Sequence, residues 1–278
     1  MLSTLELFKD SPDRFDLPAL QALLYGTVFT GKLHFAQVTD STNTDALEAA
    51  RADAPHGSVY FADEQLAGRG RSDHKWQSAA GQGLYVSILL RPNTPATALP
   101  MLPLIAGLAA ASAIKEVSGL TVDLRWPNDL LIGPRKTGGI LVEARTEADK
   151  IAHAVIGIGI NVHQREFDAG LATPATSLDL ESGRSISRHH LLISLLETLE
   201  FQTRALASPQ AFDMIPEHIE SASTWVRGKR VHVHGPQACT GVTAGLDKYG
   251  FLLVQTETGL VTVHTGGLRG AEPVHSEN

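Results

Sequence analysis

This sequence of 278 residues has a single cysteine, no net positive charge and few long apolar runs. Its one cysteine, Cys239, excludes an intrachain disulfide and a zinc site built from several cysteines. The formal net charge of -7 argues against general nucleic-acid binding, which requires a basic domain. The most apolar run, MLPLIAGLAAASAI at residues 101–114, is too short to cross a bilayer and predicts a buried helix.

The first residues do not have the pattern of a signal peptide. The segment MLSTLELFKDSPDRF places Glu6, Lys9 and Asp10 where a signal peptide needs an apolar core. We therefore expect a cytoplasmic protein with no membrane partner and, given its charge, no DNA partner. The hydrophobic content of 43% and charged content of 19% are ordinary for a globular protein, and the length suits one large and one small domain.

Hydrophobic periodicity predicts helices and strands up to residue 206. Helices are expected at residues 15–26 with Asp16 as N-cap, from Ser41 or Thr42 onward, at 99–117 before Gly119, and at 187–206. Strand-like runs occur at residues 32–39, 57–65, 83–92, 121–126, 138–145 and 152–162. Short turns join the last three runs, so we expect these three to be antiparallel neighbours.

After Trp225 the pattern changes to short alternating strands separated by glycine turns. The segments are KRVHVH, ACTGVTAGLDKYGFLLVQT and LVTVHTGGLRG. This pattern predicts a small β-barrel or sandwich. We therefore divide the chain into a main domain at residues 1–224 and a β-barrel domain at residues 225–278.

The segment EQLAGRGRSDHKW, residues 64–76, concentrates arginine, lysine and glycine and lacks the periodicity of a helix or a strand. We call it the Gly/Arg loop. The guanidinium groups of Arg69 and Arg71 can each bond two anionic oxygens, and the glycines let the backbone approach a ligand. Such a loop can cover a phosphate or a mixed anhydride and exclude water. A solvated basic turn is the plainer interpretation of this segment alone.

The segment DSTNTDA, residues 40–46, places hydroxyl and amide groups at the start of a predicted helix. Ser41, Thr42 and Asn43 would fall within one small space and would suit a polar, uncharged headgroup such as a cyclic urea. Plain N-capping explains the same residues, and on this segment alone it is the better interpretation.

The segment RWPNDLLIGPRKTGGILVE, residues 125–143, combines an unusual turn with a lysine on a glycine-marked strand. The WPND residues form the turn, and Lys136 follows Asp129 by seven positions. A lysine there can hold a carboxylate against a phosphate, while Gly138 and Gly139 leave room for a ligand along the strand. The alternative is an ordinary hairpin with an exposed lysine.

The segment GIGINV, residues 157–162, offers two glycines and the Asn161 amide on an apolar strand. The glycines again permit the close approach of a ligand. The segment does not match the dinucleotide-binding fingerprint, because Val162 stands where the last glycine should be. A buried strand with small residues explains it equally well.

Two other matches are rejected. Ser72 and Lys75 form an S-x-x-K and residues 136–138 a KTG, as in serine β-lactamases, but the serine precedes a segment that is not helical. A metal site could combine histidines of the predicted barrel with its cysteine, yet histidines on a small exposed sheet are more often solvated. Those residues are His232, His234, His264 and Cys239.

The four segments occur in one order along the chain. Ser-Thr-Asn comes first, then Gln-x-x-Gly-Arg-Gly-Arg with a tryptophan five residues beyond, then Trp-Pro-Asn-Asp with a lysine seven beyond, then Gly-x-Gly-Ile-Asn. In this order and spacing, from Lys32 to Val162, the chain resembles the biotin–protein ligases (biotin–[acetyl-CoA-carboxylase] ligases). The resemblance implies an α+β fold: a mixed-sheet catalytic domain similar to those of lipoate ligases and class II aminoacyl-tRNA synthetases, followed by an SH3-like β-barrel.

The resemblance also implies an activity and a set of site residues. Enzymes of this family form biotinyl-5′-AMP from biotin and ATP with Mg²⁺, then transfer biotin to one lysine of a biotin carboxyl carrier protein domain. The implied biotin contacts are Ser41, Thr42, Asn43, Gln65, Arg69, Gly70, Arg71, Lys136, Gly139, Gly157 and Gly159. The implied ATP or adenylate contacts are Arg69, Arg71, Trp76 on the adenine side, Asn128, Lys136, Asn161 and Arg269. No metal ligand is assigned, and Mg²⁺ is expected mainly on the ATP phosphates.

Lys136, Arg71 and Asp129 are the catalytic candidates. Attack of a carboxylate on the α-phosphorus joins two anions, so Lys136, the loop arginines and Mg²⁺ would offset the negative charge that develops. In the second step the acceptor lysine must lose a proton, and Asp129 would orient that amine or take the proton.

Two features depart from the family pattern, and some alternatives stay open. Asp73 stands where members commonly have glycine, and it would weaken the positive field of the loop. The residues before Ser41 include no clear helix-turn-helix pair, so we expect the monofunctional kind, without an N-terminal DNA-binding domain. A lipoate or octanoate ligase of the same fold and a biotin-binding module without turnover stay open, as does a homodimer formed through edge strands.

Overall fold

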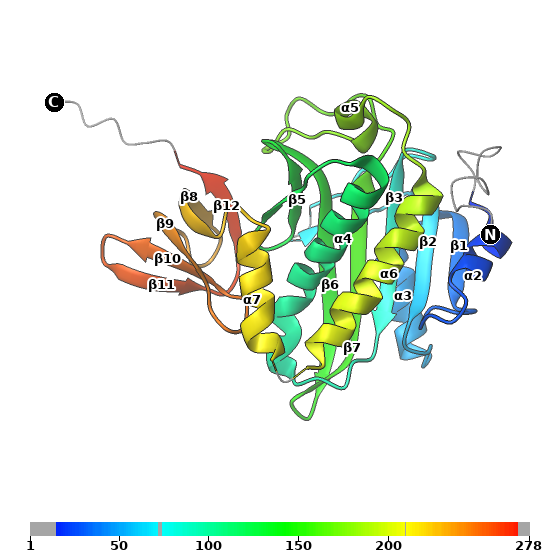
Figure 1. Ribbon diagram of the computed structural model, residues 1–278, viewed down its shortest axis with the longest axis horizontal. Coiled ribbons are helices and arrows are strands. Elements are labelled where there is room, and N and C mark those ends of the chain that lie inside the picture. Colours follow the sequence, from blue (N-terminus) through cyan, green and yellow to red (C-terminus); the bar gives the residue numbers. More distant parts are fainter. Residues whose placement is uncertain (1–14, 72–73, 209, 272–278) are drawn as a thin grey trace.

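The computed structural model describes residues 15–71, 74–208 and 210–271, so Asp73 and the N-terminal residues discussed above lie outside the described residues. Its largest unit is a seven-stranded sheet in the order β1-β2-β3-β7-β6-β5-β4 (Figure 1). The strands are β1 (Leu33–Thr39), β2 (Ser58–Gln65), β3 (Gly83–Leu90), β4 (Asp123–Arg125), β5 (Asp129–Ile132), β6 (Arg135–Glu147) and β7 (Lys150–Asn161). β1 and β2 pair in parallel and the other neighbours pair antiparallel, which confirms the predicted α+β fold with a mixed sheet.

Helices cover both faces of this sheet. They are α2 (Leu17–Leu23), α3 (Thr42–Arg51), α4 (Leu102–Ser118), α5 (Leu178–Ser182), α6 (Arg188–Leu206) and α7 (Ala211–Ser221). A 3₁₀ helix, Ala96–Met101, leads into α4. Figure 1 shows α4 and α6 side by side across one face of the sheet, with α7 next to the C-terminal strands.

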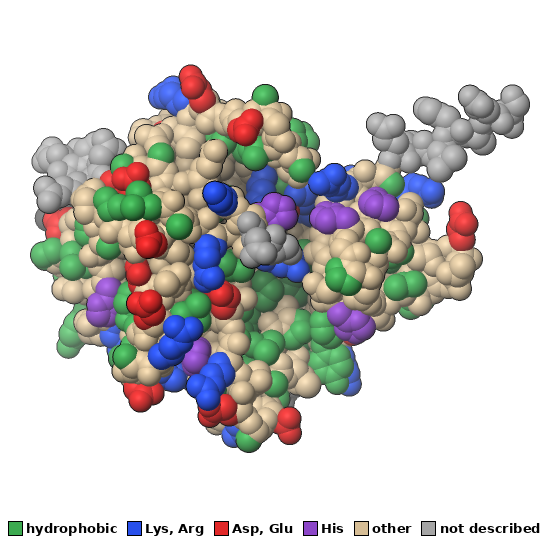
Figure 2. Space-filling view, turned by 180° about the vertical axis from the view of Figure 1, so that it is seen from behind, with side chains coloured by type: hydrophobic (Ala, Val, Ile, Leu, Met, Phe, Trp, Pro, Cys, Tyr) green, Lys and Arg blue, Asp and Glu red, His purple; other side chains and the backbone are tan. Residues whose placement is uncertain are grey.

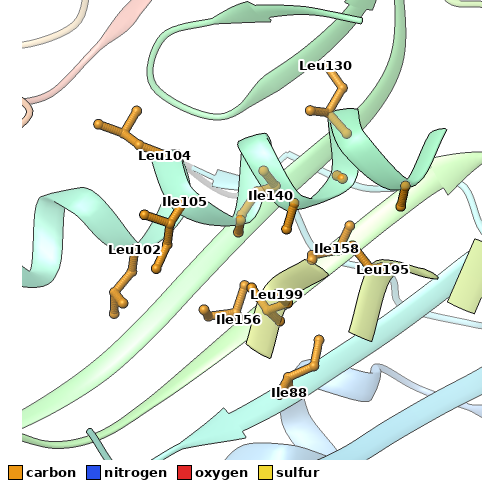
Figure 3. Close-up of a cluster of buried hydrophobic side chains, with 14 of the residues drawn as sticks. Ile88, Leu102, Leu104, Ile105, Leu130, Ile140, Ile156, Ile158, Leu195 and Leu199 are labelled. Atoms are coloured by element: carbon orange, nitrogen blue, oxygen red, sulfur yellow. The ribbon is translucent and has the colours of Figure 1, made fainter. Parts of the chain in front are cut away.

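The face beneath α4 and α6 holds the main apolar core. Ile88 of β3 pairs with Ile156 of β7, and both side chains point toward the helices (Figure 3). Leu195 and Leu199 of α6 and Ile105 of α4 close over them, and all five side chains are fully buried. Because strand side chains alternate between the two faces, the even-numbered residues of β3 and β7 form this core.

The predicted buried helix is confirmed as part of α4. The stretch Ala96–Ser118 is long and apolar enough to cross a membrane by length and composition, but 67% of its most apolar window is buried inside the protein. α4 ends at Gly119, whose φ of 77° lies in the left-handed region that favours glycine, as the sequence predicts. This helix is therefore a core element of the main sheet.

The odd-numbered residues of the same strands face the other side of the sheet. There Ala46 and Ala50 of α3 pack on Leu89 of β3 and Val155 of β7. α3 has 10 residues, so it covers only one part of this face. The remaining part, along β6 and the second half of β7, is available for a site.

The residues from Arg227 onward form a second sheet of five antiparallel strands in the order β11-β10-β9-β8-β12. Its strands are β8 (Arg227–His234), β9 (Cys239–Leu246), β10 (Leu252–Thr256), β11 (Gly259–Val263) and β12 (Gly267–Gly270). The Trp126 indole N–H donates to the Gly250 carbonyl oxygen over 3.1 Å, which joins this sheet to the turn after β4. The β character predicted here is confirmed, while the domain boundary at residue 225 stays a prediction.

The structure corrects the predicted elements in two places. Residues 121–162 contain four strands rather than three, because the short β5 forms a strand of its own between two turns. α5 and α7 are additional helices. Pro216 in the middle of α7 opposes a helix, but Ala211, Ile215 and Ile219 bury one side of it, and this packing outweighs the missing backbone donor.

Candidate active site

A cavity of about 1220 Å³ lies on the odd-numbered face of the main sheet, beside the C-terminal sheet. Figure 2 shows the hollow between the two parts of the molecule, with lysine and arginine side chains gathered around it. The implied contacts and catalytic candidates all line this cavity: Ser41, Thr42, Asn43, Gln65, Arg69, Gly70, Arg71, Trp76, Asn128, Asp129, Lys136, Gly139, Gly157, Gly159, Asn161 and Arg269. Segments far apart in the sequence thus meet here, while the role of each residue toward a ligand stays a prediction. The expectation that Gly138 leaves room for a ligand is wrong, because a Cβ there would point to the other face and lie 2.8 Å from Leu130 Cδ1.

The residues at the start of α3 form a polar network. The Thr42 hydroxyl lies 3.1 Å from Gln65 Oε1 and 2.8 Å from Ser87 Oγ. Ser87 in turn donates to Asn43 Oδ1 over 2.6 Å. Ser41 occupies the N-cap position but makes no side-chain capping hydrogen bond. Plain N-capping therefore does not explain these side chains, and the geometry favours recognition of a polar headgroup.

The glycines of β7 make room for side chains of the protein itself. A Cβ added to Gly157 would lie 2.0 Å from Asn43 Oδ1, and a Cβ added to Gly159 would lie 2.5 Å from Trp76 Nε1. Gly139 lies opposite Gly159 on β6, and its added Cβ would be 3.4 Å from the Trp76 ring. Asn43 and Trp76 thus form the wall that a ligand would meet above these strands.

A β-bulge directs Lys136 into the cavity. In the β5–β6 ladder Leu130 pairs with Gly138, but Leu131 pairs with Lys136, so the register shifts between these two pairs. A bulge interrupts the alternation of side chains along a strand. Although Lys136 has an even number, it shares a face with Gly139, whose added Cβ would lie 3.4 Å from Lys136 Nζ.

Asp129 holds Lys136 and Arg125 at the same time. Lys136 Nζ lies 2.5 Å from Asp129 Oδ1, and Arg125 Nη2 lies 2.6 Å from Asp129 Oδ2. Burial raises the pKa of the Asp129 carboxyl, but the charges of Lys136 and Arg125 and their hydrogen bonds outweigh burial, so the pKa falls below its usual value. A carboxylate with a lowered pKa is a weak base, so this geometry favours an orienting role.

Arg71 lies between the main sheet and the C-terminal sheet. Its guanidinium group donates to Asn128 Oδ1 over 3.2 Å and to the Gly266 carbonyl oxygen over 3.0 Å. Burial lowers the pKa of Arg71, and the charge of Asp129 opposes that shift. Both of these hydrogen-bond partners are neutral, so a partly buried cation here would gain from an anionic ligand.

Sequence analysis missed several polar residues at this site. Ser87 and Glu143 occupy odd positions of β3 and β6, on the cavity face, and each bonds to Asn43. His163 follows β7 on the same face, with Nδ1 2.8 Å from Asp179 Oδ2, and both of these residues line the cavity. The alternation of side chains along a strand could have placed Ser87 and Glu143 on the cavity face. A single polar residue in an apolar strand forms no recognisable motif, so neither residue was selected.

Metal-ligating side chains do not cluster in the described part of the chain. Within it, no group of three or more His, Cys, Asp or Glu residues could hold a metal ion. His232, weighed above as a ligand, has Nδ1 3.0 Å from Thr240 Oγ1.

The fold and the cavity together define a class of enzyme. A buried neutral network lies at one end of the cavity, and Lys136 and Arg71 bring positive charge to the other. Such a site suits a small acid with a polar headgroup that meets a second anion, as in the activation of a carboxylate by a nucleotide.

Comparisons with known proteins identify the family. Residues 35–161 match the biotin/lipoate A/B protein ligase family, and residues 227–266 match the biotin protein ligase C-terminal domain. The bifunctional ligase/repressor BirA of Bacillus subtilis (strain 168) is 35% identical over 239 residues, which are 85% of this chain and 73% of that protein. The chain belongs to the biotin/lipoate A/B protein ligase family.

Other relatives lead to the same family. The biotin–[acetyl-CoA-carboxylase] ligase of Mycobacterium tuberculosis (strain ATCC 25618 / H37Rv) is 30% identical over 235 residues, covering 82% of this chain and 85% of that enzyme. The structure of the Aquifex aeolicus biotin protein ligase in complex with biotin and ATP superposes with a TM-score of 0.72 at 31% identity. That similarity covers 87% of this chain and 100% of the Aquifex chain.

Replacing Gly159 with alanine should displace the Trp76 indole, since the new methyl group would lie 2.5 Å from Nε1. We expect Gly159→Ala to lose about 1–3 kcal/mol of unfolding free energy in urea and to change the near-UV circular dichroism of tryptophan. Gly139→Ala lies beneath the same indole and is the matched control, with an expected loss below about 1 kcal/mol. Equal losses in the two variants would contradict this placement of Trp76.

Asp129 should make stability depend on pH in acid. Its pKa is lower in the folded state than in the unfolded state, so its stabilisation is present above the usual carboxyl pKa and is lost as the pH falls through the folded pKa. Below about pH 4 the unfolding free energy of the wild type should fall more steeply than that of Asp129→Asn, by up to about 1.4 kcal/mol per pH unit. Urea unfolding at a series of pH values measures this, and parallel curves for the two proteins would exclude it.

Proposed function

We propose that this chain is an ATP-dependent biotin–protein ligase. It forms biotinyl-5′-AMP from biotin and ATP, then transfers biotin to a lysine of a biotin carboxyl carrier protein domain. The family membership, the relatives named as such ligases, and the similar structure that holds biotin and ATP support this proposal. The single observation in this structure that carries it is the one cavity that joins the neutral network at Thr42 and Asn43 to Arg71 and Lys136.

The neutral end of the cavity would bind the ring end of biotin. A cyclic urea presents one carbonyl acceptor and two N–H donors, which hydroxyl and amide side chains such as Thr42, Asn43 and Gln65 can match. These side chains are already fixed by bonds to one another, so little ordering is needed on binding. The Trp76 indole lies against Gly159, and its expected position on the adenine side of the ligand stays a prediction.

The charged end would carry out adenylation. A carboxylate oxygen of biotin bonds to the α-phosphorus of ATP, and the bond to the pyrophosphate oxygen breaks. Lys136 would lie between the two anions as a point charge, and Arg71 would add a guanidinium fork as negative charge develops. Mg²⁺ supplies further positive charge when it is bound to the phosphates. Asn128, Asn161 and Arg269 would line the nucleotide end.

The second step transfers the acyl group to the carrier. The amine of the carrier lysine attacks the acyl carbon, the bond from that carbon to the AMP oxygen breaks, and the amine gives up a proton. Because the pKa of Asp129 is lowered, we assign this carboxylate to orienting Lys136 and the incoming amine. Part of the Gly/Arg loop, Arg69 to Arg71, lies over this cavity and would shield the adenylate from water.

The remaining expectations about partners and location are proposals of the same kind. β1 and β4 are the outer strands of the main sheet; the backbone of Leu124 in β4 already bonds to Ala222 and Ser223, so the edge of β1 is the route we propose to a homodimer. A cytoplasmic enzyme without a DNA partner is a proposal supported by the negative net charge.

Incubation with biotin, ATP and Mg²⁺ tests the proposed function. We expect release of pyrophosphate that depends on biotin and none with lipoate or octanoate, because the polar network suits a urea headgroup. Calorimetry with biotin alone runs in parallel. Binding of biotin without pyrophosphate release would indicate a non-catalytic binding module, and release with lipoate would indicate the related ligase; either result contradicts the proposal.

Arg71→Gln tests the cation between the two sheets. Glutamine keeps some hydrogen bonding but removes the charge, so we expect kcat/KM for ATP to fall by about tenfold or more. Biotinyl-5′-AMP should also escape and label a bystander protein. Arg145→Gln is the control, because Arg145 pairs with Glu147 at the exposed end of β6. An unchanged kcat/KM in Arg71→Gln would remove Arg71 from the mechanism.

A further inference from the structure

Glu143 has no role in the function proposed above, although it lies beside the cavity. It occupies an odd position of β6, on the same face as Gly139 and Leu141, which line the cavity. Its side chain is 30% exposed. A carboxylate next to a site for anions would repel the ligand unless a cation neutralises it, so its presence there needs an explanation.

One oxygen of Glu143 serves two different parts of the site. Oε2 accepts a hydrogen bond from Asn43 Nδ2 over 2.9 Å, and it also forms a hydrogen-bonded ion pair with Arg69 Nη2. Asn43 belongs to the headgroup network, whereas Arg69 belongs to the Gly/Arg loop. A single atom therefore connects the wall of the site to the loop that lies over it.

The connection is part of a longer chain of hydrogen bonds. Starting at Ser78, just beyond the Gly/Arg loop, the bonds pass through Gln65, Thr42, Ser87 and Asn43 to Glu143 and Arg69. Gln65 and Arg69 both belong to the Gly/Arg loop, so this series of hydrogen bonds meets the loop at two places. The headgroup wall is thus joined to the loop directly at Gln65 and, through Glu143, at Arg69.

The pairing makes the two arginines of the loop unequal. The charge of Arg69 is offset by Glu143, whereas Arg71 donates to the neutral groups of Asn128 and Gly266. A neutralised guanidinium contributes little field at a distant phosphate. The geometry therefore separates an arginine that anchors the loop from an arginine that faces the anions.

We propose that Glu143 is a positioning residue for biotin binding, an inference that rests on the proposed function. It acts through Arg69 and Asn43, holding residues 69–71 of the Gly/Arg loop against the headgroup wall without touching the reacting atoms.

A double-mutant cycle tests this proposal. Glu143→Gln keeps an acceptor for Asn43 but removes the charge that pairs with Arg69, and Arg69→Gln removes the other partner. Each single variant should raise the calorimetric Kd for biotin about fivefold, and the double variant should raise it no further, since both changes break one pair. A residue that only supports the strand would give losses that add.

Ionic strength provides a second measurement. Raising KCl from about 50 mM to about 500 mM should weaken biotin binding more in the wild type than in Glu143→Gln, because salt screens a partly exposed ion pair.

The control for the double-mutant cycle uses Arg145→Gln and Glu147→Gln. These residues form an exposed pair on the same strand that lies away from the cavity, so their replacement should leave the Kd for biotin unchanged.

The outcomes are distinct. Additive losses, or equal salt dependence in the wild type and Glu143→Gln, would overturn the role of Glu143. If Glu143→Gln does not fold, Arg69→Gln alone must show the loss of affinity and the weaker salt dependence, and an unchanged Kd in that variant overturns the proposal. Absence of biotin binding by the wild type would instead reject the proposed function.

Discussion

The alternation of side chains in β3, β6 and β7 is the constraint on which the rest of this structure depends. Ile88 and Ile156 face α4 and α6, whereas Gly157 and Gly159, one and three positions further along β7, face the cavity. Because successive side chains of a strand point to opposite faces, the same strand must contribute to the densely packed core on one face and to the open site on the other. Branched apolar residues at even positions form the core, and at odd positions Ser87, Gly157 and Gly159 lie beside the cavity, whereas Leu89 and Val155 pack on α3.

Acidic side chains next to the cavity neutralise several of the cations that line it. The chain as a whole is negative, yet the cavity collects Lys136, Arg125, Arg69 and Arg71. Asp129 offsets two of these cations and Glu143 offsets a third, so the site can concentrate positive groups without strong mutual repulsion. Arg71 is instead held by neutral oxygens, which leaves its charge available to an anion. The negative net charge of the whole chain is therefore compatible with a local site for a carboxylate and a nucleotide.

Sequence motifs predicted which residues line the site because the chemistry restricts residue type at fixed spacing. The motifs could not predict in which direction each of those side chains points. The direction of Lys136 depends on a bulge, which is set by the pairing with β5 rather than by residues near Lys136. The position of Trp76 depends on glycines more than sixty residues away. Glu143 acts through contacts with two distant segments, so no local pattern reveals it. Pro216 shows the converse: a local rule against a helix was overridden by burial of its neighbours.

The turn after β4 is where these separate features meet. Trp126 donates to Gly250 and thereby holds the C-terminal sheet against the main sheet. Two residues later, Asn128 accepts a hydrogen bond from Arg71, which also reaches the backbone of Gly266 on the C-terminal side. The same short turn thus connects the placement of the second sheet to the placement of the loop arginine. Because a backbone carbonyl receives Arg71, the C-terminal sheet contributes to this site through its fold as well as through the Arg269 side chain. The distance between the two sheets therefore decides where the charge of Arg71 lies relative to Lys136.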